Sequence, residues 1–299
     1  MPVFKRNLKT QTTNKDNKSW WEKNPMNYQW ENSSGLWINE IPDISEVNKD
    51  FFLKIDKKLN ETSLQLKENY SNSPFEDLIE FKELNNKNIL EIGCGFGTHA
   101  QEIIRNSNKC VYNGVDITNK AIEYTKKRLE LFKLRGEITL ADAEKLPFKE
   151  NQFNFIWSWG VIHHSKSTEN ILQEIHRVLS KGGVCKVMVY HKNSLRYYLF
   201  GGFFLGILKG KLFQKSLEQI NLEITDGYFA RHFTKNEFKK ILENFDFRIK
   251  KILILPDSDH LPFPGGYKLK KINFKLINKF INFLCKKFGW FLYAEFEKK

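Results

Sequence analysis

Apolar positions along the chain form short runs that alternate with longer segments of helical period. Five strand-like runs follow one another: NILEI from residue 88, VYNGVDI from 111, EITLAD from 137, FNFIWSW from 153 and VCKVMVY from 184. The segments between these runs repeat apolar residues every three or four positions, as amphipathic helices do. Strands that alternate with helices build βαβ units, so we predict a parallel sheet with helices on both faces.

Local signals predict where these helices begin and end. Thr118 is placed to cap the helix after the second strand. Ile171, Ile175 and Val178 share one face of a later helix. The Lys-Gly-Gly sequence at 181–183 is predicted to end that helix, because glycine commonly follows a helix.

The pattern changes after residue 191. Residues 192–233 are a long connection rich in aromatic residues and glycine, after which Thr234 and Glu237 have the spacing of a capping box. FRIKKILIL from residue 247 and GWFLYAEFEK from 289 predict two more strands. We therefore expect four parts: an N-terminal arm (1–50), a core (51–191), an insert (192–233) and a C-terminal part of the core (234–299).

The N-terminal arm is polar but dense in aromatic side chains. Trp20, Trp21, Tyr28, Trp30 and Trp37 lie outside any clear period. Two interpretations remain open, an arm packed on the body and a lid over a ligand.

Composition narrows the class of protein. The 299 residues are 41% hydrophobic, enough for a sizeable core, and four scattered cysteines include no CxxC pair. The first residues contain no apolar leader, and no apolar run reaches the roughly 18 residues of a membrane span. We expect a globular protein of a reducing cytosol.

The formal net charge of +13 indicates either a compositional bias or an anionic partner. Seven lysines and no acid lie between Lys268 and Lys287. This segment has the pattern of a basic amphipathic helix, which could lie peripherally on an anionic membrane or pack on the body with its lysines in solvent. No nucleic-acid motif accompanies the charge, which disfavours a nucleic-acid partner.

Three glycines at alternate positions follow the first strand. Gly93, Gly95 and Gly97 permit a tight turn and close approach of a ligand to the backbone. Thr98 stands where a dinucleotide-binding fingerprint has its third glycine, and no Lys-Ser/Thr pair of a P-loop follows. The preceding acid, Glu91, suits an amine better than a pyrophosphate.

Five sequence motifs follow one another along the chain, each near the end of a predicted strand or helix: LEIGCGFG, NGVDIT, LADAEKLPF, FNFIWSWGVIHH and EIHRVLSKGG. Together they resemble the class I S-adenosylmethionine-dependent methyltransferases, in particular the type-11 group that includes ubiquinone and menaquinone C-methyltransferases. The resemblance covers roughly residues 86–192. It implies an α/β, Rossmann-like fold with a seven-stranded, mostly parallel sheet, and S-adenosyl-L-methionine as cofactor.

The resemblance also implies a set of donor-binding residues: Glu91, Gly93, Cys94, Gly95, Gly97, Asp116, Ile117, Asp142, Ala143 and Trp157. Asp116 would hold the ribose hydroxyls, Asp142 and Ala143 would read adenine, and Trp157 with the two residues after it would wall the site. Glu91 would orient the loop or meet the amino group of the donor, and a charge that caps the turn explains it equally well. Cys94 is expected to fill space and not to act as a nucleophile.

Methyl transfer needs a base only when the acceptor must lose a proton. His163 or His164 could supply it; alternatively, His163 packs and His164 caps the following segment. Tyr190 and His191 end the fifth strand and join them as catalytic candidates. No metal site is expected, because adjacent histidines point apart and lack a third ligand.

The acceptor pocket is expected to come from the arm, the end of the fifth strand and the insert. The candidate residues are Tyr28, Trp30, Arg196, Tyr197, Asp226 and Arg231. Each is equally suited to a structural salt bridge or to core packing. We predict a cytoplasmic methyltransferase that modifies an O, S, N or C nucleophile of a small, hydrophobic or anionic molecule. The alternatives are an RNA or protein methyltransferase and a non-catalytic donor-binding or membrane-surface protein.

Overall fold

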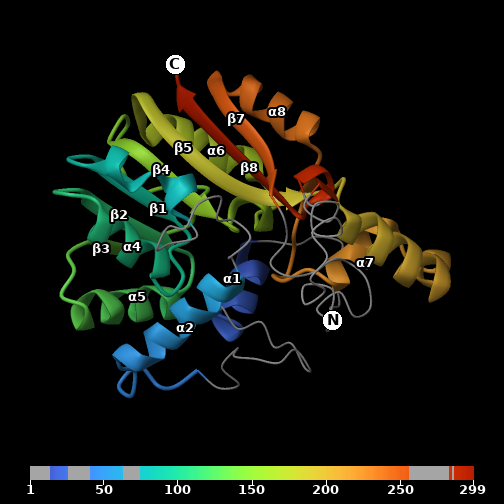
Figure 1. Cartoon of the computed structure of the whole chain (residues 1–299), viewed down its shortest axis with the longest axis horizontal. Coiled ribbons are helices and arrows are strands. Elements are labelled where there is room, and N and C mark those ends of the chain that lie inside the picture. Colours follow the sequence, from blue (N-terminus) through green and yellow to red (C-terminus); the bar gives the residue numbers. More distant parts are fainter. Residues whose placement is uncertain (1–13, 26–40, 63–74, 256–282, 285) are drawn as a thin grey trace.

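The computed structural model describes residues 14–25, 41–62, 75–255, 283–284 and 286–299 (Figure 1). Tyr28, Trp30, Trp37 and most of the lysine-rich segment lie outside these residues. The helical segments are α1 (Asn14–Lys23), α2 (Lys49–Thr62), α3 (Glu76–Ile79), η2 (Phe81–Leu84), α4 (Thr98–Asn106), α5 (Asn119–Leu131), η3 (Ile162–His164), α6 (Thr168–Val178), η4 (Arg196–Leu208), η5 (Lys211–Phe213), α7 (Leu217–Glu223) and α8 (Lys235–Asn244). The strands are β1 (Asn88–Ile92), β2 (Val111–Asp116), β3 (Glu137–Leu140), β4 (Phe153–Trp159), β5 (Leu179–His191), β6 (His232–Phe233), β7 (Phe247–Leu255) and β8 (Phe291–Lys298).

One sheet organises the described part of the chain. Its order is β3-β2-β1-β4-β5-β8-β7, and the two-residue strand β6 pairs with β5 beside this path. Every pair is parallel except those of β8, which runs antiparallel to β5 and β7. The predicted Rossmann-like, mostly parallel sheet of seven strands is confirmed, with β6 as an addition. Strand order reverses between β1 and β4, and a ligand site is expected outside the carboxyl ends there.

The two faces of the sheet carry separate cores. Along β1, Leu90 and Ile92 join the cluster that contains residues of α6 and α8, whereas Ile89 joins the cluster with residues of α4 and α5. This division follows from the two-residue period of a strand. Figure 1 shows the sheet between these helices.

The predicted glycine stop of the sixth helix is wrong. α6 ends at Val178, and β5 begins at once with Leu179, whose side chain is fully buried. Gly182 and Gly183 lie inside β5, where the register with β4 shifts and Gly182 has a φ of +70°. The helix therefore ends before the glycines, where Leu179 enters the core. The two glycines lie instead at the irregularity of β5.

The insert is folded. η4, η5 and α7 form a helical group at one end of the sheet, and β6 returns the chain to β5 (Figure 1). The predicted capping box after it is confirmed, since the side chain of Thr234 accepts from the Glu237 N–H at 3.1 Å and the Glu237 side chain accepts from the Thr234 N–H at 2.8 Å.

Candidate functional site

The glycine loop begins where β1 ends, at the switch point of the sheet. The backbone N–H groups of Gly93 and Cys94 donate to the Val115 carbonyl oxygen at 2.7 and 3.0 Å. Gly93 has a φ of +79°, and a Cβ there would lie 2.2 Å from a methyl carbon of Val161. This position therefore requires glycine on both conformational and steric grounds.

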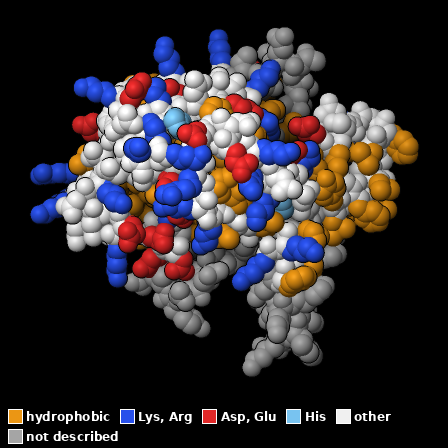
Figure 2. All heavy atoms as spheres, turned by 90° about the horizontal axis from the view of Figure 1, so that it is seen from above, with side chains coloured by type: hydrophobic (Ala, Val, Ile, Leu, Met, Phe, Trp, Pro, Cys, Tyr) orange, Lys and Arg blue, Asp and Glu red, His pale blue; other side chains and the backbone are white. Residues whose placement is uncertain are grey.

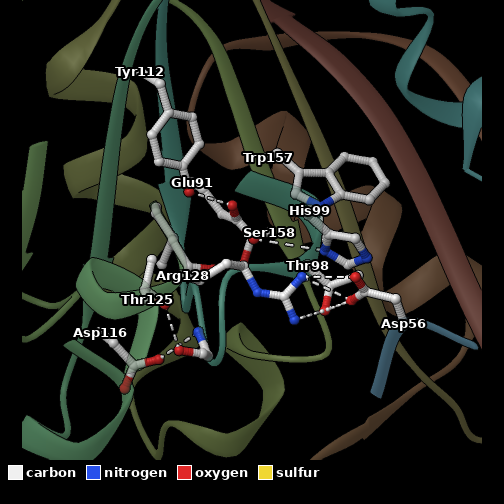
Figure 3. A network of polar contacts seen from close by, with 12 residues as sticks. Asp56, Glu91, Thr98, His99, Tyr112, Asp116, Thr125, Arg128, Trp157 and Ser158 are labelled. Atoms are coloured by element: carbon white, nitrogen blue, oxygen red, sulfur yellow. Dashed lines mark hydrogen bonds and ion pairs between the residues drawn. The ribbon is translucent and has the colours of Figure 1, made fainter. Parts of the chain in front are cut away.

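Asp116 ties the loop to the end of β2. One carboxylate oxygen accepts from the Gly95 N–H at 3.1 Å, and the other accepts from the Thr118 N–H at 3.0 Å and the Thr118 hydroxyl at 2.8 Å. Figure 3 shows Asp116 near Thr125 and apart from the contacts between Arg128 and Asp56. Burial raises the pKa of Asp116, which the hydrogen bonds oppose. The carboxylate is thus held in one orientation at the carboxyl edge of the sheet.

Asp142 lies at the neighbouring strand end. The Ala141 N–H donates to the Asp116 carbonyl oxygen at 2.9 Å, and Asp142 accepts from the Glu144 N–H at 3.0 Å. Ile117, Asp142 and Ala143 are all half-buried. Parallel register places the glycine loop, Asp116 and Asp142 along one edge, which we call the donor edge.

Glu91 and Trp157 lie beneath the donor edge. The Glu91 carboxylate is 2% exposed, accepts from the Tyr112 hydroxyl and lies 3.5 Å from His99 Nδ1. Trp157 is fully buried and donates its indole N–H to His99 Nδ1 at 3.1 Å (Figure 3). Trp157 lies within β4 and does not follow it, as the sequence had predicted, and its side chain packs under the donor edge. Its role as a wall of the donor site stays a prediction. Cys94 is buried, and burial raises the pKa of its thiol well above the usual range, which keeps it protonated.

A buried ion pair fastens the N-terminal part of the chain beside the loop. The Arg128 guanidinium, fully buried in α5, contacts both carboxylate oxygens of Asp56 in α2 at 2.8 and 2.9 Å (Figure 3). Thr98, the first residue of α4, donates its hydroxyl to the same carboxylate at 2.9 Å. Sequence reasoning missed this pair, because Arg128 stands in a lysine-rich helix that predicts solvent exposure.

Helix α1 spans from the donor edge to the insert. The Glu22 carboxylate accepts from the Asn119 and Lys120 N–H groups at 3.0 and 3.2 Å, at the start of α5. Asn17 donates to the His164 carbonyl oxygen and accepts from the Phe229 N–H at 3.1 Å. The helix is thus packed on the body at the place where a lid would act.

A second group of side chains lies beyond η3, and we call it the aromatic–histidine cluster. His163 contacts Tyr190 with ring centroids 3.9 Å apart, and Tyr190 in turn contacts His232 and Trp290 at 5.8 and 4.9 Å. Tyr197 contacts His232 at 5.1 Å. All five side chains are at least nine-tenths buried. The cluster joins β5, η3, the insert and the residue before β8.

The histidines of the cluster are neutral at physiological pH. Burial lowers the pKa of His163 well below its usual range, and burial with the nearby charges of Arg196 and Lys192 lowers that of His232 to about 3. Among the described residues, neither ring nitrogen of His232 has a hydrogen-bond partner. The Tyr190 hydroxyl donates to Asp226, so two predicted residues far apart in sequence do meet.

Other predicted residues make structural contacts around the cluster, and the His164 ring lies 4.2 Å from that of His163. His164 Nδ1 lies 2.8 Å from the Phe229 carbonyl oxygen, and His191 Nδ1 lies 2.9 Å from that of Gly289. Arg231 pairs with Glu169 at 2.8 Å. Arg196 donates to the Ile224 carbonyl oxygen at 2.7 Å, with its guanidinium 4.7 Å from the centroid of the Trp290 ring. The two arginines therefore have different partners.

Comparison with known proteins agrees with this geometry. A family of methyltransferase domains matches residues 89–183, from β1 into β5. The chain is 29% identical over 145 residues to a phthiotriol/phenolphthiotriol dimycocerosates methyltransferase of Mycobacterium tuberculosis, covering 48% of this chain and 52% of that protein. The chain therefore spans about half the length of the curated relatives it matches.

A second sequence relative and one solved structure are also similar to this chain. The chain is 30% identical over 101 residues to a fatty-acid O-methyltransferase of Mycolicibacterium smegmatis, covering 34% of this chain and 36% of that protein. A crystal structure of geranyl diphosphate C-methyltransferase from Streptomyces coelicolor superposes with a TM-score of 0.53 at 15% identity, over 75% of this chain and 76% of that one. At that identity the likeness shows the fold alone.

Sequence reasoning missed two members of the aromatic–histidine cluster, His232 and Trp290. His232 stands in a two-residue strand, which is too short for any periodic signal, and Trp290 precedes the last strand. Within the described residues, no group of three or more potential metal ligands comes together, and no helix has the length and apolarity to traverse a bilayer.

Proposed function

We propose that the protein is an S-adenosylmethionine-dependent methyltransferase that modifies a small molecule. One observation carries the proposal: the Gly95 N–H donates to the Asp116 carboxylate, so the glycine loop and the ribose-binding candidate form one unit. The match of residues 89–183 to methyltransferase domains supports it.

The donor edge offers groups for each part of the donor. Gly93, Gly95 and Gly97 would pass beneath its methionine and ribose portions, and Asp116 would accept its ribose hydroxyls. Asp142 and the Ala143 backbone would contact adenine. Glu91 would hold the loop in position from beneath, through its contacts with Tyr112 and His99. These roles rest on the position of the residues at adjoining strand ends.

The acceptor would lie at the aromatic–histidine cluster. Val161, which packs against Gly93, is separated from His163 by one residue, so the cluster adjoins the donor edge. The reaction is an in-line displacement: the acceptor nucleophile bonds to the methyl carbon, the sulfur–carbon bond breaks, and the sulfur keeps the electron pair. Alignment to about 3–3.5 Å can supply much of the rate.

The protonation state of the histidines narrows the acceptor. A general base works best with a pKa near the operating pH, whereas the pKa values of His163 and His232 are far lower. We therefore infer an acceptor that is already nucleophilic at neutral pH, in particular a carboxylate. Arg196 and Lys192 make the surroundings of His232 electropositive, which suits an anion. The fatty-acid O-methyltransferase similar to this chain is named for such an acceptor.

One experiment with labelled donor tests methyl transfer and the carboxylate acceptor separately. Extracts are incubated with the protein and methyl-labelled S-adenosylmethionine, and the labelled product is then treated with base. Release of labelled methanol identifies a methyl ester and supports the carboxylate. A base-stable label would refute the carboxylate and leave the methyltransferase standing. Absence of donor binding in calorimetry would refute the methyltransferase itself.

Two rival functions make different predictions. Modification of RNA would show a steep loss of affinity with added salt, because many phosphates are contacted, whereas turnover of a small carboxylate with a single charge would fall only modestly. A protein that binds the donor without catalysis would give calorimetric binding and no labelled product.

The free thiols of Cys94, Cys110 and Cys185 support action in a reducing cytosol.

A further inference from the structure

The end of the insert exposes large apolar side chains in one place. The apolar tip consists of Tyr198, Phe203, Ile207, Leu208, Leu212 and Phe213. Phe213 is 92% exposed, and Ile207 and Leu208 are each 60% exposed. The other exposed large hydrophobic side chains of the described residues, Leu53, Val111, Leu140 and Phe283, are far from these in sequence. In Figure 2 hydrophobic atoms gather over one side of the molecule.

The opposite face of η4 is already packed. Leu205 is buried with Ile220 and Ile224 in a small core of the insert. Gly201 lets α7 approach closely, since a Cβ there would lie 2.4 Å from the Asn221 side-chain oxygen. η4 is therefore apolar on its buried face and on its exposed face, a pattern typical of a helix with a second apolar environment.

The charges beside the tip indicate what this second apolar environment of η4 is. Residues 196–217 contain Arg196, Lys209, Lys211 and Lys215 and no acid. Glu223 at the end of α7 pairs with Lys211 of η5 at 2.5 Å and with Lys215, which holds η5 against α7. Apolar side chains beside lysines are the arrangement with which proteins bind the interface of an anionic bilayer.

The tip is also placed for such a contact. Figure 1 shows the helices of the insert extending away from the sheet, at the end opposite β3. A patch that projects can enter a planar surface without moving the rest of the molecule. The base of the same helix, at Tyr197, belongs to the aromatic–histidine cluster.

We propose that the apolar tip inserts into the interface of an anionic lipid bilayer, with Lys209 and the Glu223-paired Lys211 and Lys215 at the level of the headgroup phosphates. The single Glu223 carboxylate offsets only one of the two ammonium charges that it contacts, so the group stays positive. The proposal does not depend on methyl transfer, because the tip is remote in sequence from the donor edge. It differs from the possible contact of the lysine-rich segment 268–287, since it assigns the binding to described side chains of the insert.

Vesicle flotation of the full-length protein tests the proposal. Vesicles of phosphatidylcholine are compared with vesicles of phosphatidylcholine and phosphatidylglycerol. The variant Leu208→Ser/Phe213→Ser removes two apolar side chains from the tip. The control Val111→Ser/Leu140→Ser removes two apolar side chains that are 57% and 44% exposed, from β2 and β3 outside the tip. Thermal melting reports whether each variant is folded.

We expect the wild type and the control to float with the anionic vesicles. The tip variant should partition about tenfold to a hundredfold more weakly, because each lost side chain forfeits apolar burial in the membrane. Moderate salt should weaken binding without abolishing it, since salt screens the lysines only.

Three results would overturn the proposal. The first is no binding of the wild type to anionic vesicles. The second is undiminished binding of the tip variant, which would assign the contact to another segment. The third is a dimer in light scattering that the tip variant dissociates without any change in vesicle binding, which would make the tip a contact between two copies.

Discussion

Replacing Asp116 with alanine should greatly weaken donor binding while the protein stays folded. If the carboxylate accepts both ribose hydroxyls, the variant loses two hydrogen bonds to a charged group, each contributing about 1.5–3 kcal/mol. The sum, about 3–6 kcal/mol, corresponds to a loss of affinity of roughly 10²–10⁴-fold. The three hydrogen bonds from Gly95 and Thr118 are lost as well, but removal of a buried charge offsets part of that cost.

Asp43 provides a matched control for this experiment. It accepts from the Ser45 N–H at 3.0 Å and from the Ser45 hydroxyl at 2.6 Å, the same local turn that Asp116 makes with Thr118. It is exposed and lies outside the donor edge. Asp43→Ala should therefore change donor affinity by less than about threefold.

Calorimetry with S-adenosylhomocysteine measures both variants without turnover, and urea denaturation checks their stability. Asp116→Asn keeps one oxygen acceptor, so its affinity should lie between those of the wild type and the alanine variant. A folded Asp116→Ala protein with donor affinity close to the wild type would refute the ribose assignment. An equal loss in Asp43→Ala would show that the effect is not specific to the donor edge.

Three other changes test the supports of the site. Gly93→Ala should lower donor affinity at least about tenfold, because the new methyl group meets the Val161 side chain at 2.2 Å and the φ of +79° disfavours any side chain. Gly182→Ala, at a φ of +70° with open space around it, should cost about 1–2 kcal/mol of stability and leave affinity unchanged. Equal donor affinity in the two proteins would contradict this explanation. Asp56→Ala should lower the free energy of unfolding by about 3–5 kcal/mol, because it leaves the Arg128 charge buried, and adding Arg128→Met should recover part of the loss in urea denaturation. A loss below about 1 kcal/mol would show that the pair is immaterial. Because the pKa of His232 is depressed to about 3 in the fold, its contribution to stability is present above pH 6.5 and lost as the pH falls towards 3. Between pH 6.5 and 5 that loss is about 2 kcal/mol, and His232→Phe should show a shallower decline with acid; identical pH dependence would contradict a neutral, buried His232.

The sequence predicted the elements whose signals are local. β4 was expected from FNFIWSW and has the same bounds, and Thr118 caps α5 by accepting from the Ala121 N–H at 3.3 Å. The glycine loop and Asp116 follow strands, so their meeting at one edge follows from parallel pairing. These features depend on periods and spacings that a single segment carries.

Features that depend on contacts between distant segments were not predictable. Arg128 is fully buried although its neighbours are lysines, because Asp56 reaches it from 72 residues away. His232 contacts Tyr190 only because a two-residue strand pairs with β5. The glycines at 182–183 have the composition of a helix stop, yet Leu179 before them and Val184 after them both pair with β4, which keeps the glycines within the strand. In each case tertiary packing decides between outcomes that local sequence leaves open.

A crystal structure with bound S-adenosylhomocysteine tests the central claim most directly. The account predicts the ribose hydroxyls on the Asp116 carboxylate, the adenine beside Asp142 and Ala143, and the methionine portion over Gly93 and Gly95. A nucleoside bound elsewhere, with Asp116 still occupied by protein donors alone, would contradict the account.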